Sequence, residues 1–322
     1  MASDGNGTGD GALSPDEAFA VLGNDTRMAI LRALGEAEKP LSFSELRDRV
    51  GMGDSGQFNY HLDRLEGQFV RDSGKGYGLR QAGRRVIEAV LSGAVTESPR
   101  IEPTRIDQAC PHCGARIAAG FHEERLELFC PDCEGMYTSD NSVQELPDHA
   151  DYGYIGGILL PPAGVQGRTP AEMTRAAITW ANLEFAAGAA GVCPRCSARF
   201  DQSITACESH EAGDGLCGAC GRRYATLVLN ECTTCNFEYV GSVLLALLDD
   251  TEFLSFLIDH GVNPVTPSPE RYVAIDMDHE EELLSLDPFE GRFTFTVDGD
   301  ALTVTLDDGP DVVGTRRHPT SE

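Results

Sequence analysis

Apolar residues in the first hundred positions recur at the three-to-four-residue spacing of amphipathic helices. Capping boxes begin at Ser14 and at Ser42, and Asn24 and Asp54 are further N-cap residues. We therefore predict four short helices in this region, the first of which ends near Leu22.

A Gly-containing turn at residues 51–53 joins the third and fourth predicted helices, as in a helix-turn-helix. Residues 69–71 and 77–79 predict a two-stranded hairpin, and residues 80–91 predict a closing amphipathic helix. This order of elements predicts a helix-turn-helix followed by a hairpin wing.

Residues 15–93, about a quarter of the chain, resemble the ArsR-type winged helix-turn-helix transcriptional regulators, of a halophilic archaeal type. The resemblance lies in LGNDTRMAIL at 22–31, FNYHL at 58–62 and GYGLRQAG at 76–83. It implies that the fourth helix lies in the major groove of DNA and that the wing touches the backbone or the minor groove. It also implies a homodimer that reads two half-sites about one helical turn apart. The metal-sensing cysteine pair of some ArsR proteins is absent, since no cysteine precedes residue 110.

Polar residues on the outer face of the fourth helix and basic residues of the wing are the candidate DNA contacts. Gln and Asn suit adenine edges, whereas Arg suits guanine or phosphate. The candidates are Ser55, Gln57, Asn59, Tyr60, Arg64, Arg71, Lys75 and Arg80.

The distribution of charge singles out the same segment. The net charge is −27, but residues 15–95 hold 12 acidic and 11 basic side chains, so that residues 96–322 carry −24. Lys39 and Lys75 are the only lysines, and an acidic excess with few lysines resembles proteins from organisms with a salt-filled cytoplasm. A segment without the acidic excess is the one expected to approach the phosphates of DNA.

All 11 cysteines fall between residues 110 and 235, and ten of them form C-x-x-C pairs. The eleventh, Cys207, precedes His210 at the same spacing, which makes 12 ligands for three four-coordinate zinc ions. Sites closed by four ligands predict structural zinc, and no catalytic residues are predicted. The predicted ligands are Cys110, Cys113, Cys130, Cys133, Cys193, Cys196, Cys207, His210, Cys217, Cys220, Cys232 and Cys235.

The first four cysteines predict one zinc ribbon with a turn near Gly120. The other eight ligands allow three pairings. A Gly-rich turn at 211–215 favours a nested one, in which two antiparallel strands join the outer pairs at one end and the inner pairs at the other. Two sequential ribbons and a cross-brace remain the alternatives.

The rest of the chain predicts an α+β fold. We interpret residues 151–167 as a linker, 243–258 as an apolar helix, and 271–275 and 292–313 as strands, with the acidic run 276–282 as solvated surface. The predicted map is a disordered tail at 1–13, a winged helix-turn-helix domain at 14–95, a zinc ribbon at 105–140, a linker and helix at 141–190, a two-zinc module at 191–242, an acidic α+β module at 243–315 and a tail at 316–322.

No apolar run reaches the roughly 18 residues of a membrane span, and the N-terminus does not read as a signal peptide. We therefore expect a cytoplasmic, non-enzymatic transcriptional regulator that binds double-stranded DNA as a homodimer. For the zinc-rich half the sequence leaves three roles open: a surface for assembly, a surface for a partner, and a small-molecule pocket. The alternative is a transcription accessory factor that contacts RNA polymerase, because winged helix plus zinc ribbon is also the layout of an initiation-factor family. An enzyme that uses one zinc is a third, weaker hypothesis.

Overall fold

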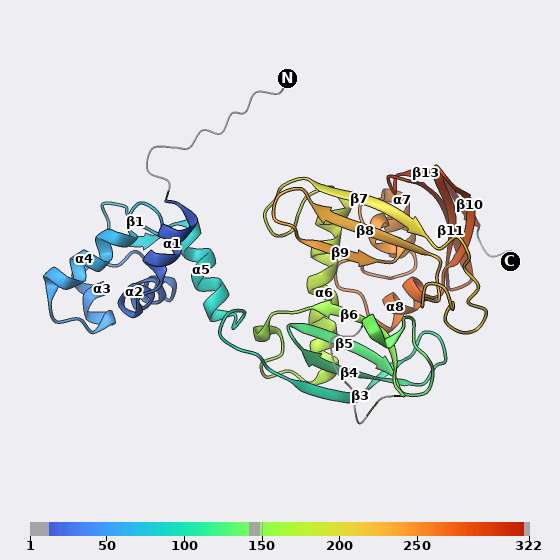
Figure 1. Ribbon diagram of the computed structural model, residues 1–322, viewed down its shortest axis with the longest axis horizontal. Coiled ribbons are helices and arrows are strands. Elements are labelled where there is room, and N and C mark those ends of the chain that lie inside the picture. The colour runs from blue at the N-terminus through green and yellow to red at the C-terminus, as the bar shows by residue number, and fades with distance from the viewer. Residues whose placement is uncertain (1–12, 142–148, 150, 319–322) are drawn as a thin grey trace, which may run out of the picture. The chain divides into compact units, whose positions relative to one another are not determined.

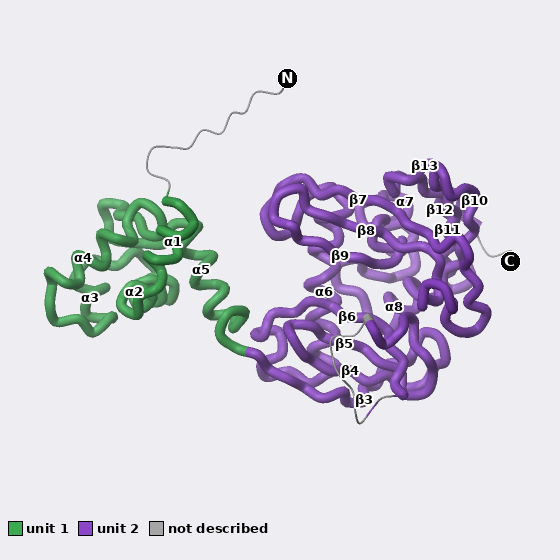
Figure 2. The backbone as a smooth tube through the Cα atoms, viewed as in Figure 1, with its two compact units in different colours: residues 1–97 green, residues 98–322 purple. Residues whose placement is uncertain are grey.

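The computed structural model describes residues 13–141, 149 and 151–318 of a mixed α+β chain (Figure 1). The chain divides into two compact units, Met1–Glu97 and Ser98–Glu322 (Figure 2). Apart from Leu13, the tail predicted at 1–13 lies outside the described residues. Of the tail predicted at 316–322, residues 316–318 instead end a strand, and the others lie outside the description.

The described part of unit 1, from residue 13 onward, consists of five helices and one antiparallel hairpin. The capping predicted at Ser14, Asn24, Ser42 and Asp54 is confirmed, because each side chain accepts a hydrogen bond from the first turn of its helix. The elements are α1 (Pro15–Leu22), α2 (Asp25–Gly35), α3 (Phe43–Val50), α4 (Ser55–Leu65), β1 (Val70–Asp72), β2 (Tyr77–Leu79) and α5 (Gln81–Leu91).

The core of unit 1 forms where α2, α3 and α4 bury their apolar faces together. Leu31, Leu46, Phe58 and Leu62 have no exposed surface. The Phe58 ring meets the Phe43 ring edge-on, with 5.1 Å between the ring centroids. Because Phe58, Leu62 and Leu65 point inward, the polar positions between them on α4 face outward, except for the buried His61.

Unit 2 contains three antiparallel sheets. The first has the order β3 (Ile101–Ala109), β4 (Arg116–His122), β5 (Arg125–Cys130), β6 (Gly153–Leu159). The second has the order β7 (Phe200–Ala206), β8 (Thr226–Cys232), β9 (Glu238–Gly241). The third has the order β10 (Glu280–Leu286), β11 (Phe289–Val297), β12 (Asp300–Asp307), β13 (Val312–His318).

The long helix α6 (Pro170–Ala189) reaches from the first sheet to the second (Figure 1). Met173 and Ala177 join the core of the first sheet, whereas Ile178 and Phe185 join a core shared by the second and third sheets. The other helices among the residues that the structure describes are η1 (Ser139–Asn141), η3 (Pro162–Gly164), η4 (Val243–Leu247), α7 (Thr251–Asp259) and α8 (Pro269–Met277). Of the helices in the described part of the chain, none combines the length and the apolar content that a membrane crossing requires.

Two predictions about the first sheet are wrong. The segment 151–167, interpreted as a linker, contains strand β6, which pairs with β5. The predicted turn near Gly120 lies instead at Glu123 and Glu124, whose backbones have positive φ angles of 47° and 60°. Gly120 itself sits inside β4, opposite Glu127.

Two predictions about the C-terminal part are also wrong. Residues 243–258 are not one helix, because Asp250 caps the first turn of α7 and separates it from η4. Residues 271–275, interpreted as a strand, form part of α8, whose first turn begins with Pro269. Within residues 292–313, which were interpreted as strands, β11 and β12 pair as an antiparallel hairpin that turns at Asp298 and Gly299.

Candidate metal centres and a candidate nucleic-acid interface

The 12 predicted ligands assemble into three groups, in each of which the four ligand atoms lie within 4.8 Å of one another. The nested pairing is the one present, so sequential ribbons and a cross-brace are excluded. The groups are Cys110, Cys113, Cys130 and Cys133; Cys193, Cys196, Cys232 and Cys235; and Cys207, His210, Cys217 and Cys220.

The strand register explains the nested arrangement. Phe200 pairs with Cys232 at one end of the β7–β8 ladder, and Ala206 pairs with Thr226 at the other. The outer cysteine pairs therefore meet at the first end, and the inner ligands meet at the second. A two-stranded antiparallel ladder thus separates two of the three ligand groups.

The C-x-x-C pairs share a local backbone turn that directs both sulfurs to one point. In the pair that begins with Cys193, the Ser197 amide donates to the Cys193 carbonyl and the Arg195 amide donates to the Cys193 sulfur. The residue after the second cysteine has a positive φ in four pairs, at Gly114, Ser197, Gly221 and Asn236. Glycine fits such a position without strain and asparagine tolerates it, so Gly114, Gly221 and Asn236 follow from the turn geometry.

Distances between sulfur atoms match the edges of a metal tetrahedron. Bonds of about 2.3 Å from a central zinc would hold two sulfurs about 3.8 Å apart, whereas a disulfide would hold them at about 2.05 Å. All 11 cysteines are free thiols. The Sγ–Sγ distances are 3.8 Å for Cys110–Cys133, 3.5 Å for Cys113–Cys130, 3.7 Å for Cys193–Cys235 and 3.5 Å for Cys196–Cys232.

His210 is oriented by a partner that the sequence did not reveal. Its Nε2 lies 2.9 Å from the Arg223 carbonyl oxygen, which can only accept a hydrogen bond, so Nε2 carries the proton. Nδ1 is left with a free lone pair and lies 3.4 Å from the Cys220 sulfur. Such an outer hydrogen bond fixes the tautomer and the ring orientation of a metal-ligating histidine.

Backbone amides prepare two of the cysteines for metal binding. The amides of Glu211, Cys220 and Ala219 lower the pKa of the Cys217 thiol to about 6. Hydrogen bonds from the backbone amides of Cys235 and Thr234 likewise lower the pKa of the Cys232 thiol to about 6. Because the thiolate is the form that binds a metal, these shifts favour the liganding state near neutral pH.

The eight candidate DNA contacts are all exposed. Gln57, Tyr60 and Arg64 project from α4, and the Arg64 guanidinium lies over the Tyr60 ring, 5.5 Å from its centroid. None of Arg64, Arg71, Lys75 and Arg80 forms an ion pair with the described residues.

Two of the candidates already have side-chain partners. The Arg47 guanidinium donates to the Ser55 hydroxyl at 2.9 Å, and the Asn59 amide donates to the Asp63 carboxylate at 2.8 Å. Sequence reasoning missed Arg47 and Asp63, although Asp63 lies one helical turn after Asn59. Arg47 brings a further cation from α3 to the start of α4.

The interpretation of residues 276–282 as solvated surface is wrong for two of the acidic side chains. The Glu281 carboxylate accepts hydrogen bonds from the backbone amides of Ala225 and Thr226, at 2.7 and 3.3 Å. The Asp276 carboxylate accepts a hydrogen bond from the Ser242 hydroxyl, and burial raises the pKa of Asp276. These two carboxylates therefore belong to the interior of unit 2.

The comparisons with known proteins return families without an assigned function. Residues 107–312 match the model described as domain of unknown function DUF7351, and residues 15–90 match domain of unknown function DUF7347. No curated protein and no solved structure matches the chain.

Proposed function

This chain belongs to the family of the domain of unknown function DUF7351, and we propose from its own residues that it is a DNA-binding transcriptional regulator. In this proposal unit 1 is a winged helix-turn-helix of ArsR type, and α4 reads the major groove of double-stranded DNA. The observation that carries the proposal is the outer face of α4, where Gln57, Tyr60 and Arg64 are exposed, together with the exposed Arg71 and Lys75 of the β1–β2 hairpin.

The order of elements in unit 1 supports this proposal. Helix α3 is followed by a short turn at 51–54 and by α4, and the β1–β2 hairpin comes next. In helix-turn-helix proteins the second helix of such a pair presents its N-terminal residues to base edges. Ser55 and Gln57 occupy those positions in α4.

The basic side chains of unit 1 also support the proposal of DNA binding. The cations at Arg64, Arg71 and Lys75 have no ion-pair partner among the described residues, although the chain carries an acidic excess of 27. Cations without acidic partners are available to neutralise phosphates and to release the counterions held there. On binding, Asn59 would exchange its bond to Asp63 for a base edge, so we assign most of the readout to Gln57, Tyr60 and Arg64.

We further propose that the three ligand groups hold structural zinc ions. Each group offers four nitrogen or sulfur ligands at tetrahedral spacing, and this donor set is typical of closed structural zinc sites. With every coordination position supplied by the chain, no position is left for a substrate, and we propose that the protein is not an enzyme. Metal analysis of the purified protein should find three zinc ions per chain.

A homodimer completes the proposal. Helix α1 has no buried residue and leaves Phe19 with 74% of its surface exposed. Leu91 and Val95, at and beyond the end of α5, are 53% and 67% exposed. Large apolar side chains of this kind are commonly covered by a partner. A second copy would also bring a second α4 to the same DNA.

The experiment that tests the proposal is selection from a pool of random DNA duplexes by the full-length, zinc-loaded protein in concentrated salt. We expect the wild type to enrich a discrete sequence with two half-sites. A variant that carries Gln57→Ala, Asn59→Ala and Tyr60→Ala should lose this enrichment. A control variant with Glu36→Ala, Glu38→Ala and Lys39→Ala, also exposed, should retain it.

Two outcomes would overturn the proposal. One is enrichment that is the same for the wild type and for the α4 variant. The other is a wild-type protein that selects no sequence and instead co-purifies with RNA polymerase, as a transcription accessory factor would.

A further inference from the structure

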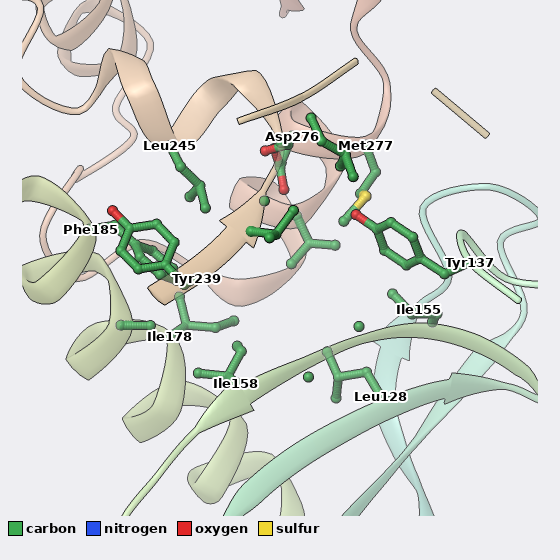
Figure 3. A pocket seen from close by; sticks show the side chains of 18 of the residues that line it. Leu128, Tyr137, Ile155, Ile158, Ile178, Phe185, Tyr239, Leu245, Asp276 and Met277 are labelled. Carbon is green, nitrogen blue, oxygen red and sulfur yellow. The ribbon is translucent and has the colours of Figure 1, made fainter. Parts of the chain in front are cut away.

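Unit 2 contains a cavity of about 520 Å³, partly open to solvent, between the first two sheets, α6 and α8 (Figure 3). Natural small-molecule sites have volumes of about 300–1,000 Å³ and often lie where separate substructures meet. The cavity has this size and this position. It contains none of the DNA-contact candidates of unit 1, and of the metal ligands only Cys220 touches it.

Most of the cavity wall is apolar. Leu128 and Ile158 project from the first sheet, Ile178 and Phe185 from α6, and Leu245 from η4 (Figure 3). In a core, such side chains would be packed against one another without a gap. Here they face a common space that is large enough for the apolar body of a ligand.

Gly156 helps to keep the space open. It pairs with Leu128 across β5 and β6, so both residues face the same side of the sheet. A Cβ atom at Gly156 would meet no atom within 4 Å. The glycine therefore leaves room beside Leu128 that a larger residue would fill.

Two acidic residues line this space, the exposed Glu238 and the part-buried Asp276, and Asp276 is the one set among apolar side chains. Figure 3 shows the Asp276 carboxylate between Leu245 and Met277, pointing into the cavity. Its hydrogen-bond donor is the Ser242 hydroxyl, and the charge of His279 acts on it only at a distance, since no described arginine, lysine or histidine nitrogen forms an ion pair with it. Desolvation penalises a buried carboxylate unless a cation or several donors compensate it.

The guanidinium groups on the cavity wall do not provide that compensation. Arg125 donates to the Tyr154 hydroxyl at 3.3 Å, and Arg222 donates to the Ala225 carbonyl at 2.9 Å. Aromatic rings are present as well, since Tyr137 and Tyr239 flank the space on opposite sides (Figure 3). The faces of such rings attract cations.

We propose that this cavity binds a small organic cation: an amine with an apolar or aromatic body, whose ammonium group pairs with Asp276. The apolar wall takes the body of the ligand, and the tyrosine rings add a cation–π attraction. The proposal does not depend on DNA binding, because every group that it uses belongs to unit 2.

The test uses full-length, zinc-loaded protein and two probe amines, phenylethylamine and hexylamine. Each amine is compared with its alcohol analogue and its carboxylate analogue by isothermal titration calorimetry and by ligand-observed NMR. Concentrated salt screens the many exposed acidic groups but screens a buried pair much less, so it suppresses binding to the surface. We expect at least one amine to bind at least tenfold more tightly than its alcohol and its carboxylate.

Three variants locate the binding. Asp276→Asn keeps the shape of the side chain but removes its charge, and should weaken amine binding at least tenfold. Asp278→Asn, at an exposed position two residues later, should leave it unchanged. Gly156→Val occupies part of the cavity beside Leu128 and should weaken the binding of the amines and of the alcohols alike.

Zinc content and thermal unfolding of each variant establish that it is folded. Amines that bind no better than their alcohols would overturn the proposal. Amine binding that Asp276→Asn and Asp278→Asn reduce equally would also overturn it, because it would assign the effect to surface charge.

Discussion

The two lysines of the chain offer a matched comparison at the residue scale. Lys75 lies in the turn between β1 and β2, and Lys39 lies between α2 and α3, both exposed. Leu41 pairs antiparallel with Tyr77, which places Lys39 on the side away from that turn. If the hairpin contacts DNA, only Lys75 neutralises a phosphate.

We predict that Lys75→Ala weakens DNA binding and lowers the slope of log affinity against log salt by about 0.9, the value expected for one phosphate contact. Lys39→Ala should change neither quantity. Fluorescence anisotropy titrations at several salt concentrations measure both. Equal slopes for wild type and Lys75→Ala would show that the hairpin does not contact the backbone.

His279 is expected to make the stability of unit 2 depend on pH. Its side chain is 1% exposed, its ring stacks on Tyr224 with 4.3 Å between centroids, and Nε2 lies 3.6 Å from Glu281. Burial lowers the pKa of His279, but Glu281, the Asp276 carbonyl and the Asp276 carboxylate together outweigh burial and raise it above its ordinary value. Protonation of His279 therefore stabilises the folded state.

The stabilisation that protonated His279 provides should be complete below pH 6.5, the ordinary histidine pKa. It should be lost as the pH rises through the raised pKa of His279 in the folded protein. Denaturant unfolding at a series of pH values should show that the wild type loses stability relative to His279→Gln as the pH increases. A difference between the two proteins that does not change with pH would mean that His279 stays neutral.

At the scale of elements, α1 is the helix that most needs a partner. Phe19 is 74% exposed on a helix with no buried residue. We predict that Phe19→Glu converts a dimer into a monomer, because a charge placed in an apolar interface loses its hydration. Light scattering measures the mass, and Ile258→Glu, on α7 at 59% exposure, is the control that should leave it unchanged.

The elements that the sequence predicted are those whose signals are local. Capping boxes at Ser14, Ser42 and Thr169 act within a single turn, so the starts of α1, α3 and α6 could be found without knowledge of the fold. The C-x-x-C turns are equally local. The nested pairing followed from them together with the position of one Gly-rich turn.

The elements that the sequence missed depend on distant contacts. Strand β6 contains Gly153, Gly156 and Gly157, which have low strand propensity, and it forms because β5 offers it an edge. In α8, Tyr272, Val273 and Ile275 favour a strand, but burial of Tyr272 and Ile275 against the C-terminal core selects a helix. Ser268-Pro269-Glu270 was a helix-start signal that could have identified α8.

At the scale of the whole molecule, the two units differ in whether they contain candidate metal ligands. Unit 1, residues 1–97, contains no cysteine and has its own apolar core, whereas all three ligand groups lie in unit 2. We predict that a strong chelator unfolds unit 2 and leaves unit 1 folded. Residue-resolved NMR before and after chelation should show retained signals for residues 15–91 alone.

Simultaneous loss of both sets of signals would contradict this prediction, because it would mean that unit 1 needs unit 2 in order to fold. A fragment that ends at residue 97 provides the control. If the units are independent, its spectrum should match that of unit 1 in the whole chain.

The candidate sites differ in how far the sequence could predict them. The metal groups were predictable because their ligands carry a spacing signature. The cavity was not, because Leu128, Ile178, Tyr239 and Asp276 come from four elements that only the folded chain brings together. Asp276 in particular looked like one member of an acidic surface run.

The central claim is that the outer face of α4 lies against DNA. Hydroxyl-radical labelling of side chains tests it most directly, because Tyr60 is 53% exposed on that face and Trp180, in unit 2, is 44% exposed. With a selected duplex present, we predict strong protection of Tyr60 and unchanged labelling of Trp180. Bound DNA that leaves the labelling of Tyr60 unchanged would contradict the claim.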